Sequence, residues 1–341
     1  MKFDYVVGTG GVGKGILYKL DGEHTLGRNE SRPAHLTDWR DYCKLHIVTH
    51  YIATFTKDRI PVYAVSAVGN DEAGQELVDR MQKAGINTDY ITIDNKRATL
   101  FAVCFQYPNG DGGNITPENT AASSVSAINI ENFFDVCQHG KQGIVLSLPE
   151  VPVDARLHML RKGREHGCFN AASLLTGDAS LFQSEKVFEL IDLLAVNAEE
   201  ASAISSLNGA NDPDSCYEFL RKKNPDIRLL VTLGAKGVYY YHAGNRQLCP
   251  SVKSTVASTA GAGDCFLGTL IAAMIHRIPF EKTQSMDGVI TSAVELAQIA
   301  SSMKVGCADT IDFSINWQSL LDFAASKNLM ISDTIRSIIS L

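Results

Sequence analysis

Short apolar runs alternate with amphipathic stretches along most of the chain. Residues 143–148 (GIVLSL) and 193–197 (LLAVN) are continuously hydrophobic, and each run leads into a stretch with helical spacing. Uninterrupted apolar strands between helices are typical of a parallel sheet that is covered on both faces. Strands are predicted at 2–8, 61–69, 143–148, 193–197 and 227–234, and helices at about 71–84, at about 153–166, from 198, and up to about 275. The pattern therefore predicts an α/β fold.

Two segments break this alternation. Residues 15–40 are rich in glycine and polar residues and have the character of extended chain, and residues 97–120 predict a hairpin with PNGDGG at its turn. We expect both to leave the main sheet and to pair as a small β-lid over a pocket. No repeat or linker marks a boundary, so residues 1–341 are interpreted as one domain with the lid segments inserted. Exposed lid strands can pair with a second copy, which makes a homodimer through the lid a hypothesis.

Charge and composition exclude several functional classes. The chain has 31 Lys and Arg against 38 Asp and Glu, a net charge of −7, which disfavours broad attraction to nucleic acids or anionic membranes. No apolar run approaches the roughly 18 residues of a membrane helix, and the start MKFDYVVGTGG lacks the features of a signal peptide. Eight cysteines without a C-x-x-C pair favour a reducing compartment. We expect a cytoplasmic protein whose partner is a small molecule, with neither nucleic acid nor membrane.

The N-terminal segment 8–15 (GTGGVGKG) matches two phosphate-binding patterns. Its spaced glycines form the G-x-G-x-x-G of dinucleotide-binding folds, and Lys14 completes most of a P-loop, although Gly15 stands where a hydroxyl would bind Mg²⁺. Both patterns require the loop to open a helix. The following residues alternate like a strand and contain more glycines, which are costly in a helix. A strand-to-strand turn is favoured, while a loop facing the substrate and a nicotinamide dehydrogenase stay as alternatives.

A stronger signal is the run S-T-A-G-A-G-D-C at 258–265, which precedes an apolar helix. Small residues allow backbone N–H groups to surround an anion, and the helix that starts there adds the positive end of its dipole. Asp264 places one carboxylate beside this anion hole. Phosphoryl transfer needs both parts, since the hole stabilises the transferred charge while a carboxylate accepts a hydroxyl proton. The alternative for Asp264 is a simple helix cap, and Cys265 is expected to be a small packing residue.

The same run resembles the second signature, D-T-x-G-A-G-D, of the ribokinase-like (PfkB-type) carbohydrate kinases. The resemblance implies a three-layer αβα fold with a mainly parallel sheet and a small β-lid, and an ATP- and Mg²⁺-dependent kinase. It also implies that Asp264 is the base that activates the acceptor hydroxyl, and that Gly261, Ala262 and Gly263 form the anion hole. Ser258 stands where the family usually has an Asp that helps to shape a monovalent-cation loop, so a need for potassium is left open.

Two further motifs occur in the family's order. Asn197-Ala-Glu-Glu200 resembles N-x-x-E, which implies that Asn197 and Glu200 lie near the Mg²⁺, through water, and near the phosphates. T-L-G-A-K-G at 232–237 resembles the family's nucleotide loop, which implies that Thr232, Gly234 and Gly237 line the ATP site. Singly, a dipole-stabilising Glu and a hairpin turn would explain these motifs. The resemblance spans roughly 60–310 and the first strand, and it includes V-G-N-D at 68–71.

The acceptor side departs from the family pattern. The family carries a diglycine and an Asn that hold the sugar, whereas Asp41–Ala53 (DYCKLHIVTHYIA) has no glycine pair. Candidate substrate residues are Lys14, Asp21, Arg28, Asn29, Glu30, His50 and Arg97, and the lid arginines suit a phosphate or carboxylate on the acceptor. His46 and His50 lie four apart on a predicted helix, which allows a metal pair, an acceptor contact or packing; H-I-V-T-H lacks the Glu of a zinc hydrolase.

The sequence thus predicts an ATP-dependent phosphotransferase that acts on the hydroxymethyl group of a sugar or sugar-like small molecule. A nucleoside kinase of the same superfamily is the first alternative. A non-catalytic sensor that binds a nucleotide or sugar is an alternative of another class, because the acceptor region is so altered.

Overall fold

A ten-stranded sheet forms the middle of this computed structural model, which describes residues 2–37, 40–57, 59–109, 112–137, 141–282 and 288–339. In spatial order its strands are β15 (Asn245–Cys249), β14 (Val238–His242), β13 (Arg228–Thr232), β12 (Leu193–Asn197), β11 (Phe169–Ala172), β10 (Gly143–Ser147), β1 (Tyr5–Thr9), β5 (Val62–Gly69) and β6 (Ile86–Asn87), with β7 (Ile91–Asp94) also paired to β5. Neighbours from β13 to β6 are parallel. β14 and β15 add two antiparallel strands at one edge.

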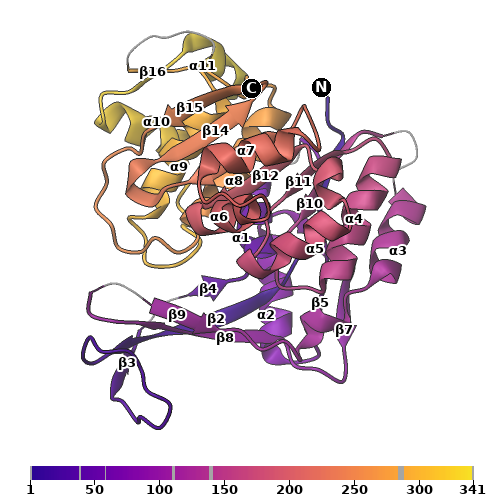
Figure 1. Cartoon of the computed structure of the whole chain (residues 1–341), viewed down its shortest axis with the longest axis vertical. Helices are drawn as coiled ribbons and strands as arrows, with labels where there is room; N and C mark the ends of the chain where they lie inside the picture. Colours follow the sequence, from indigo (N-terminus) through magenta and orange to yellow (C-terminus); the bar gives the residue numbers. More distant parts are fainter. Residues whose placement is uncertain are drawn as a thin grey trace.

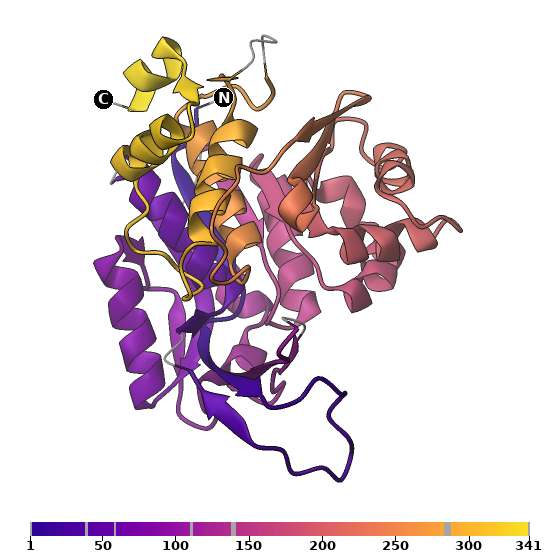
Figure 2. The same cartoon turned by 90° about the vertical axis from the view of Figure 1, so that its left-hand side faces the viewer.

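Helices cover both faces of this sheet (Figures 1 and 2). One apolar core joins the sheet to α1 (Lys44–Thr56), α2 (Glu72–Lys83), α8 (Ala262–Ile275), α9 (Ala293–Lys304) and α10 (Trp317–Ser326). Two further cores hold α3 (Ala127–Cys137), α4 (Val153–Glu165), α5 (Ala179–Ser184), α6 (Ala198–Ser206) and α7 (Pro213–Arg221) on the opposite face. The C-terminal end adds β16 (Val289–Ile290), β17 (Met330–Ile331) and α11 (Asp333–Ile339). None of the helices in the described ranges has the length and apolarity to cross a bilayer.

The continuously apolar strands explain this layering. Val6 and Val7 are adjacent in β1 and are both fully buried, one in the core under α8 and the other in the core under α3 and α4. Because successive side chains of a strand point to opposite faces, a run without polar positions needs cover on both sides. The predicted three-layer αβα fold is confirmed, and strands and helices begin and end within a few residues of the predicted bounds.

The glycine-rich segment after β1 connects two strands. Residues 10–12 lead directly into β2 (Gly13–Leu20), so the predicted strand-to-strand turn is confirmed. A Cβ at Gly13 would lie 2.6 Å from the carbonyl oxygen of Leu100, which shows that the glycine allows two backbones to approach closely. The dinucleotide and P-loop patterns are chance matches, since each requires a helix at this place.

The two predicted lid segments form a second, five-stranded sheet at one end of the molecule (Figure 1). Its order is β3 (Ala34–Leu36), β2, β8 (Leu100–Gln106) and β9 (Gly112–Ile115), with β4 (Asp41–Tyr42) paired to β2. β2 and β8 run parallel, whereas β8 and β9 form the predicted hairpin. Residues 110 and 111 of its turn lie outside the described residues. The homodimer through this sheet stays a prediction.

Helices α1 and α8 pack in close contact with each other. A Cβ at Gly268 of α8 would lie 2.7 Å from the carbonyl oxygen of Val48 and 2.8 Å from Cβ of Tyr51, both on α1. The absence of a side chain at Gly268 therefore sets the distance between the two helices. This contact also fixes the first turn of α8 relative to the first turn of α1.

We expect the Gly268→Ala substitution to lower the free energy of unfolding by about 1–3 kcal/mol, because the added methyl group overpacks the crossing. Urea unfolding would measure the loss. Gly177→Ala is the matched control, since a Cβ there meets no atom within 4 Å, and it should change stability by less than about 0.5 kcal/mol. Equal losses in the two variants would contradict the close crossing.

Candidate active site

The first turn of α8 presents backbone N–H groups beside bare glycines. Gly261 precedes the helix with φ of 75°, and a Cβ there would lie 2.3 Å from the carbonyl oxygen of Thr310. A Cβ at Gly263 would meet no atom within 4 Å, so this residue faces open space. The first N–H groups of a helix have no partner within it and carry the positive end of its dipole. The N–H of Ala262 donates to the carbonyl oxygen of Thr259 at 3.2 Å, so the predicted anion hole keeps the N–H groups of Gly261 and Gly263 as its candidate donors.

Asp264 lies on this turn beside a partly buried ammonium group. The Nζ of Lys44, the first residue of α1, is 3.5 Å from Oδ1 of Asp264. Burial alone would disfavour the charge on Lys44, but the carboxylates of Asp264, Glu200 and Glu150 together raise the pKa of this lysine. A positive charge therefore lies next to the Asp264 carboxylate.

Asn197 and Glu200 lie on one turn, as predicted. Asn197 ends β12 and caps α6: its Oδ1 accepts from the N–H of Glu200, and Oε2 of Glu200 accepts from the N–H of Asn197, both at 2.8 Å. Burial raises the pKa of Glu200. The two residues line a cavity of about 250 Å³ together with Lys44 and Asp264. Amide and carboxylate oxygens are ligands that Mg²⁺ accepts, usually with several waters retained, so this donor set fits the ion.

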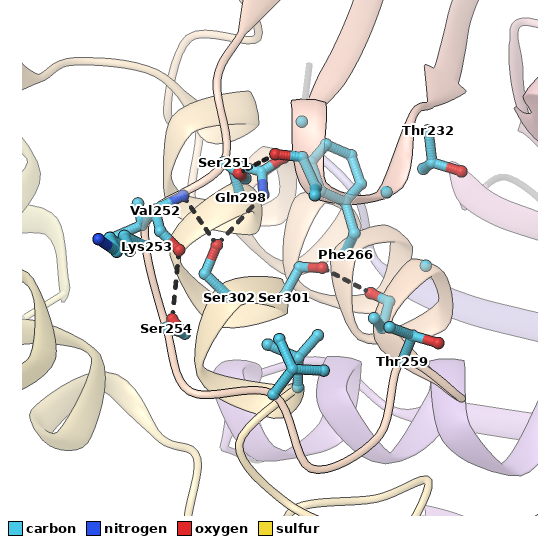
Figure 3. Close-up of a pocket in the computed structure, with 17 residues that line it drawn as sticks. Thr232, Ser251, Val252, Lys253, Ser254, Thr259, Phe266, Gln298, Ser301 and Ser302 are labelled. Atoms are coloured by element: carbon cyan, nitrogen blue, oxygen red, sulfur yellow. Dashed lines mark hydrogen bonds between the residues drawn. The ribbon is translucent and has the colours of Figure 1, made fainter. Parts of the chain in front are cut away.

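A cavity of about 420 Å³ lies between the β13–β14 connection and helices α8 and α9 (Figure 3). The three predicted nucleotide residues line it: Thr232 ends β13, while Gly234 and Gly237 flank the turn that follows. Gly237 has φ of 102°, and a Cβ there would lie 2.1 Å from the carbonyl oxygen of Cys249. Gly263 lines the same cavity, which therefore reaches the anion hole.

The walls of this cavity combine apolar and polar side chains (Figure 3). Its apolar residues include Val252, Val256, Phe266 and Val305. On α9, Oγ of Ser302 accepts from Nε2 of Gln298 at 3.3 Å and from the N–H of Val252 at 3.1 Å. Ser301 donates to the carbonyl oxygen of Ala262 at 3.0 Å and so ties α9 to the first turn of α8. The cavity is thus lined both by apolar side chains and by hydrogen-bonding groups.

A third cavity, of about 230 Å³, lies on the other side of Asp264. We call it the acceptor cavity, and it shares Lys44 and Asp264 with the cavity at Asn197. Its charged residues are Lys14, Asp41, Lys44, Glu150 and Asp264. Oε2 of Glu150 accepts from the N–H of Lys44 at 3.1 Å, so a residue distant in sequence caps α1. Asp264 therefore lies where the two cavities meet.

Sequence reasoning did not single out Lys44, Asp41 or Glu150. Glu150 follows β10 at the carboxyl edge of the parallel sheet, where ligands of such folds bind, and this position was the available signal. Lys44 and Asp41 lie in the segment 41–53, which lacks the glycine pair that the family carries there. They gain their place only because β4 pairs with β2.

The candidate substrate residues are placed unequally. Lys14 lines the acceptor cavity, with its Nζ 2.9 Å from Oε2 of Glu76. Arg28 and Asn29 are exposed in the connection between β2 and β3. Arg97 is half-exposed and pairs with Asp94 at 3.0 Å. Neither these three residues nor Asp21 and Glu30, which pair with His35 and with Arg32, line the three cavities.

The histidines of α1 are buried among aromatic rings and line none of the three cavities. The His46 ring lies 4.8 Å from that of Tyr42, and the His50 ring 5.0 Å from that of Phe313. Burial lowers the pKa of His46 to about 3 and that of His50 to about 4, so both rings are neutral. Among the described residues, no group of three or more His, Cys, Asp or Glu could hold a metal ion. Of the three interpretations left open, packing is the one that this position supports.

Comparison with known proteins agrees with this geometry. The model of the pfkB family carbohydrate kinases matches residues 48–317. Ribokinase of Staphylococcus aureus is 23% identical over 257 residues, which are 71% of this chain and 75% of that protein. The chain covers 80% of the ribokinase of Schizosaccharomyces pombe, at 23% identity, but only 37% of the longer bifunctional ribokinase/ribose-5-phosphate isomerase A of Fructilactobacillus sanfranciscensis.

Solved structures share the whole fold. The nucleoside kinase of Burkholderia thailandensis in complex with inosine superposes with a TM-score of 0.75 at 15% identity, over 95% of this chain and 99% of that one. An Escherichia coli structure described as a ribokinase II in complex with ATP and Mg²⁺ gives 0.73 at 18% identity, over 95% and 100%. Since the family model covers most of its length, the chain belongs to the pfkB family of carbohydrate kinases and is a phosphotransferase.

Proposed function

We propose that the chain transfers the terminal phosphoryl group of ATP to a hydroxymethyl group of a sugar or sugar-like molecule. We call the cavity of about 420 Å³ the nucleotide cavity. One observation carries this proposal: the start of α8 lines the nucleotide cavity through Gly263 and the acceptor cavity through Gly261 and Asp264. A phosphate bound at this turn would lie next to an acceptor hydroxyl, because Gly263 and Asp264 are adjacent residues and line the two cavities. In-line transfer requires this opposed arrangement of donor and acceptor.

The nucleotide cavity suits ATP. Its apolar residues, among them Phe266 and Val252, can pack against a purine ring, while a triphosphate can extend to the N-terminus of α8, where backbone N–H groups favour anions. The Escherichia coli neighbour was solved with ATP and Mg²⁺. Asn197 and Glu200 would hold the Mg²⁺, through water, and the ion would supply positive charge that neutralises the phosphates.

The chemistry assigned to the chain's own residues is limited. Asp264 accepts the proton of the acceptor hydroxyl as the oxygen–phosphorus bond forms and the bond between the β- and γ-phosphates breaks. The N–H groups of Gly261 and Gly263 stabilise the charge on the transferred group, while the N–H of Ala262 donates to the carbonyl oxygen of Thr259 and holds the turn. Lys44 orients Asp264 through its ammonium group 3.5 Å away. ADP and the phosphorylated acceptor are the products.

The acceptor cavity suits a polyhydroxy molecule. It combines carboxyl and ammonium groups, which accept and donate hydrogen bonds to neighbouring hydroxyls. A larger cavity of about 650 Å³ adjoins it and shares Leu100, Asn114, Thr116 and Glu150. This adjoining space specifically favours the second candidate, a nucleoside kinase, because a base could occupy it while the ribose fills the acceptor cavity. The Burkholderia thailandensis neighbour was solved with inosine.

The Asp264→Asn variant should fold normally but lose at least about 100-fold in turnover, since a positioned base typically contributes 10²–10⁴-fold. The measurement is ADP release under saturating substrates, with the binding of a non-hydrolysable ATP analogue as the test of folding. Asp154→Asn changes an exposed first-turn carboxylate of α4 and serves as the control. If Asp264→Asn turned over at the wild-type rate, Asp264 would not be the catalytic base.

An acceptor panel tests the function as a whole. Pentoses, hexoses, sugar acids and nucleosides are incubated with ATP and Mg²⁺, and ADP formation is recorded. We expect turnover with a sugar or a nucleoside. A clear preference for nucleosides would select the second candidate. ATP binding without transfer to any acceptor would instead favour the sensor.

Two buried carboxyl groups set the charge of the acceptor cavity. Burial raises the pKa of Glu150 to about 7 and that of Asp41 to about 6. Sγ of Cys104 donates to Oδ2 of Asp41 at 3.7 Å, and this bond opposes the effect of burial. Both groups therefore titrate near neutral pH. In its protonated form, each carboxyl can donate a hydrogen bond to an acceptor hydroxyl.

The raised pKa of Glu150 makes stability depend on pH. Its ordinary pKa of 4.5 applies to the unfolded chain and about 7 to the folded chain, so folding favours the protonated form. The contribution to the free energy of unfolding is therefore full below pH 4.5 and is lost between 4.5 and 7. Relative to Glu150→Gln, the wild type should lose on the order of 3 kcal/mol across this range. Urea unfolding at several pH values would measure this; the exposed Glu72→Gln control should run parallel to the wild type.

A further inference from the structure

Lys304 is a buried cation at the back of the active site. It is the last residue of α9, and its side chain is completely inaccessible to solvent. Its Nζ donates to the carbonyl oxygens of Cys307 at 3.3 Å and of Ser258 at 3.5 Å. Within the described residues it forms no ion pair with a carboxylate. Burial lowers the pKa of Lys304, and the two carbonyl groups that accept from its ammonium offset part of the cost of burying this charge.

The two carbonyl groups belong to the two segments that cross the site. The segment 258–264 includes Thr259, which lines the nucleotide cavity, and Gly261, which lines the acceptor cavity. The segment 304–310 likewise includes Val305 at the nucleotide cavity and Thr310 at the acceptor cavity. Lys304 therefore joins the turn that forms the anion hole to the loop that lies against it.

Further hydrogen bonds show that these segments form one unit. The N–H of Ser258 donates to the carbonyl oxygen of Val305 at 3.1 Å. Oγ1 of Thr310 accepts from the N–H of Tyr42 at 2.9 Å, and the carbonyl oxygen of Thr310 lies where a Cβ at Gly261 would be. A shift at the Lys304 ammonium would therefore be transmitted both to the anion hole and to β4 in the wall of the acceptor cavity.

A monovalent metal ion does not fit this place. Such an ion needs several oxygen ligands, and the two carbonyl oxygens that converge here already accept from Lys304. The side chain at 258 is a hydroxyl, and its Oγ accepts from the N–H of Ala260 at 3.2 Å. An ammonium carries the same single charge as K⁺ and also binds carbonyl oxygens.

We propose that the Lys304 ammonium is a built-in cation that holds the anion-hole turn, so that phosphoryl transfer by this chain requires no monovalent metal ion. Lys304 is a positioning residue in this proposal, because it acts through the carbonyl groups of Ser258 and Cys307. The inference rests on the proposed kinase function. It is consistent with the electrostatic influence of Lys304 on Asp41, whose carboxyl lines the acceptor cavity.

The test measures turnover of the full chain in potassium, ammonium, sodium and choline chloride at constant ionic strength, with the best acceptor of the panel. The wild type should turn over at the same rate in all four salts. Lys304→Ala should lose about 10–100-fold in kcat in choline, because the turn is no longer held in place. Potassium or ammonium should restore part of this loss by entering the vacated space.

Lys304→Met is the matched variant, because its side chain fills the space without a charge. It should lose kcat like Lys304→Ala, but no salt should restore it. Stimulation of the wild type by potassium would overturn the proposal. Unchanged kcat in Lys304→Met, or a loss in Lys304→Ala that no cation restores, would also overturn it and leave Lys304 with a packing role.

A second readout separates this proposal from the kinase function. The thermal unfolding midpoint of Lys304→Ala should rise in potassium or ammonium relative to choline, while those of the wild type and Lys304→Met should not. If no acceptor is phosphorylated by any variant, the proposed function fails, and this midpoint alone decides the role of Lys304. No selective rise in Lys304→Ala would then reject the built-in cation.

Discussion

The site depends on the contact between the first turns of α8 and α1. The proposed transfer requires the N-terminal N–H groups of α8 to face a phosphate, and side chains must then leave this turn uncovered. Gly261 and Gly263 leave it bare, and Gly268 allows α1 to pack closely behind it. The same crossing places Lys44 beside Asp264. A gap between these helices would therefore separate the anion hole from the acid–base group.

Electrostatics then divides the site into regions of different character. Carboxyl groups gather on the acceptor side, where Asp41, Glu150 and Asp264 face the ammonium groups of Lys14 and Lys44. The nucleotide side combines an apolar pocket with backbone N–H groups. In the proposed reaction, Asp264 is the one of these three carboxyl groups that meets the transferred phosphate, while Glu200 lies near the phosphates through the Mg²⁺.

The sequence predicted those parts of the fold that depend on local pattern. Apolar runs identify the strands of the sheet, and the motifs at 197–200, 232–237 and 258–264 lie together as the resemblance implied. The strand β2, which begins at Gly13, was also predictable, because its alternating pattern and its glycines disfavour a helix. These features are each encoded within about ten consecutive residues, which is why a single chain suffices to find them.

The acceptor residues could not be found in this way. Glu150 meets Lys44 only because parallel strands bring their carboxyl ends to one edge, and no spacing in the chain expresses that contact. The histidines of α1 lie at helical spacing, yet it is the surrounding rings of Tyr42 and Phe313 that bury them. The sequence predicts a substrate role for Arg97, whereas in the structure its guanidinium forms an ion pair with Asp94, three residues away.

The two cavities also differ in how the chain builds them. The nucleotide cavity is lined by residues between 232 and 305, whereas the acceptor cavity takes residues from seven separate stretches spread between Lys14 and Thr310. Insertions or substitutions in the stretches before residue 232 can therefore reshape the acceptor side while the walls of the nucleotide side are kept. The fold thus lets acceptor preference diversify piece by piece, with the phosphate donor held constant.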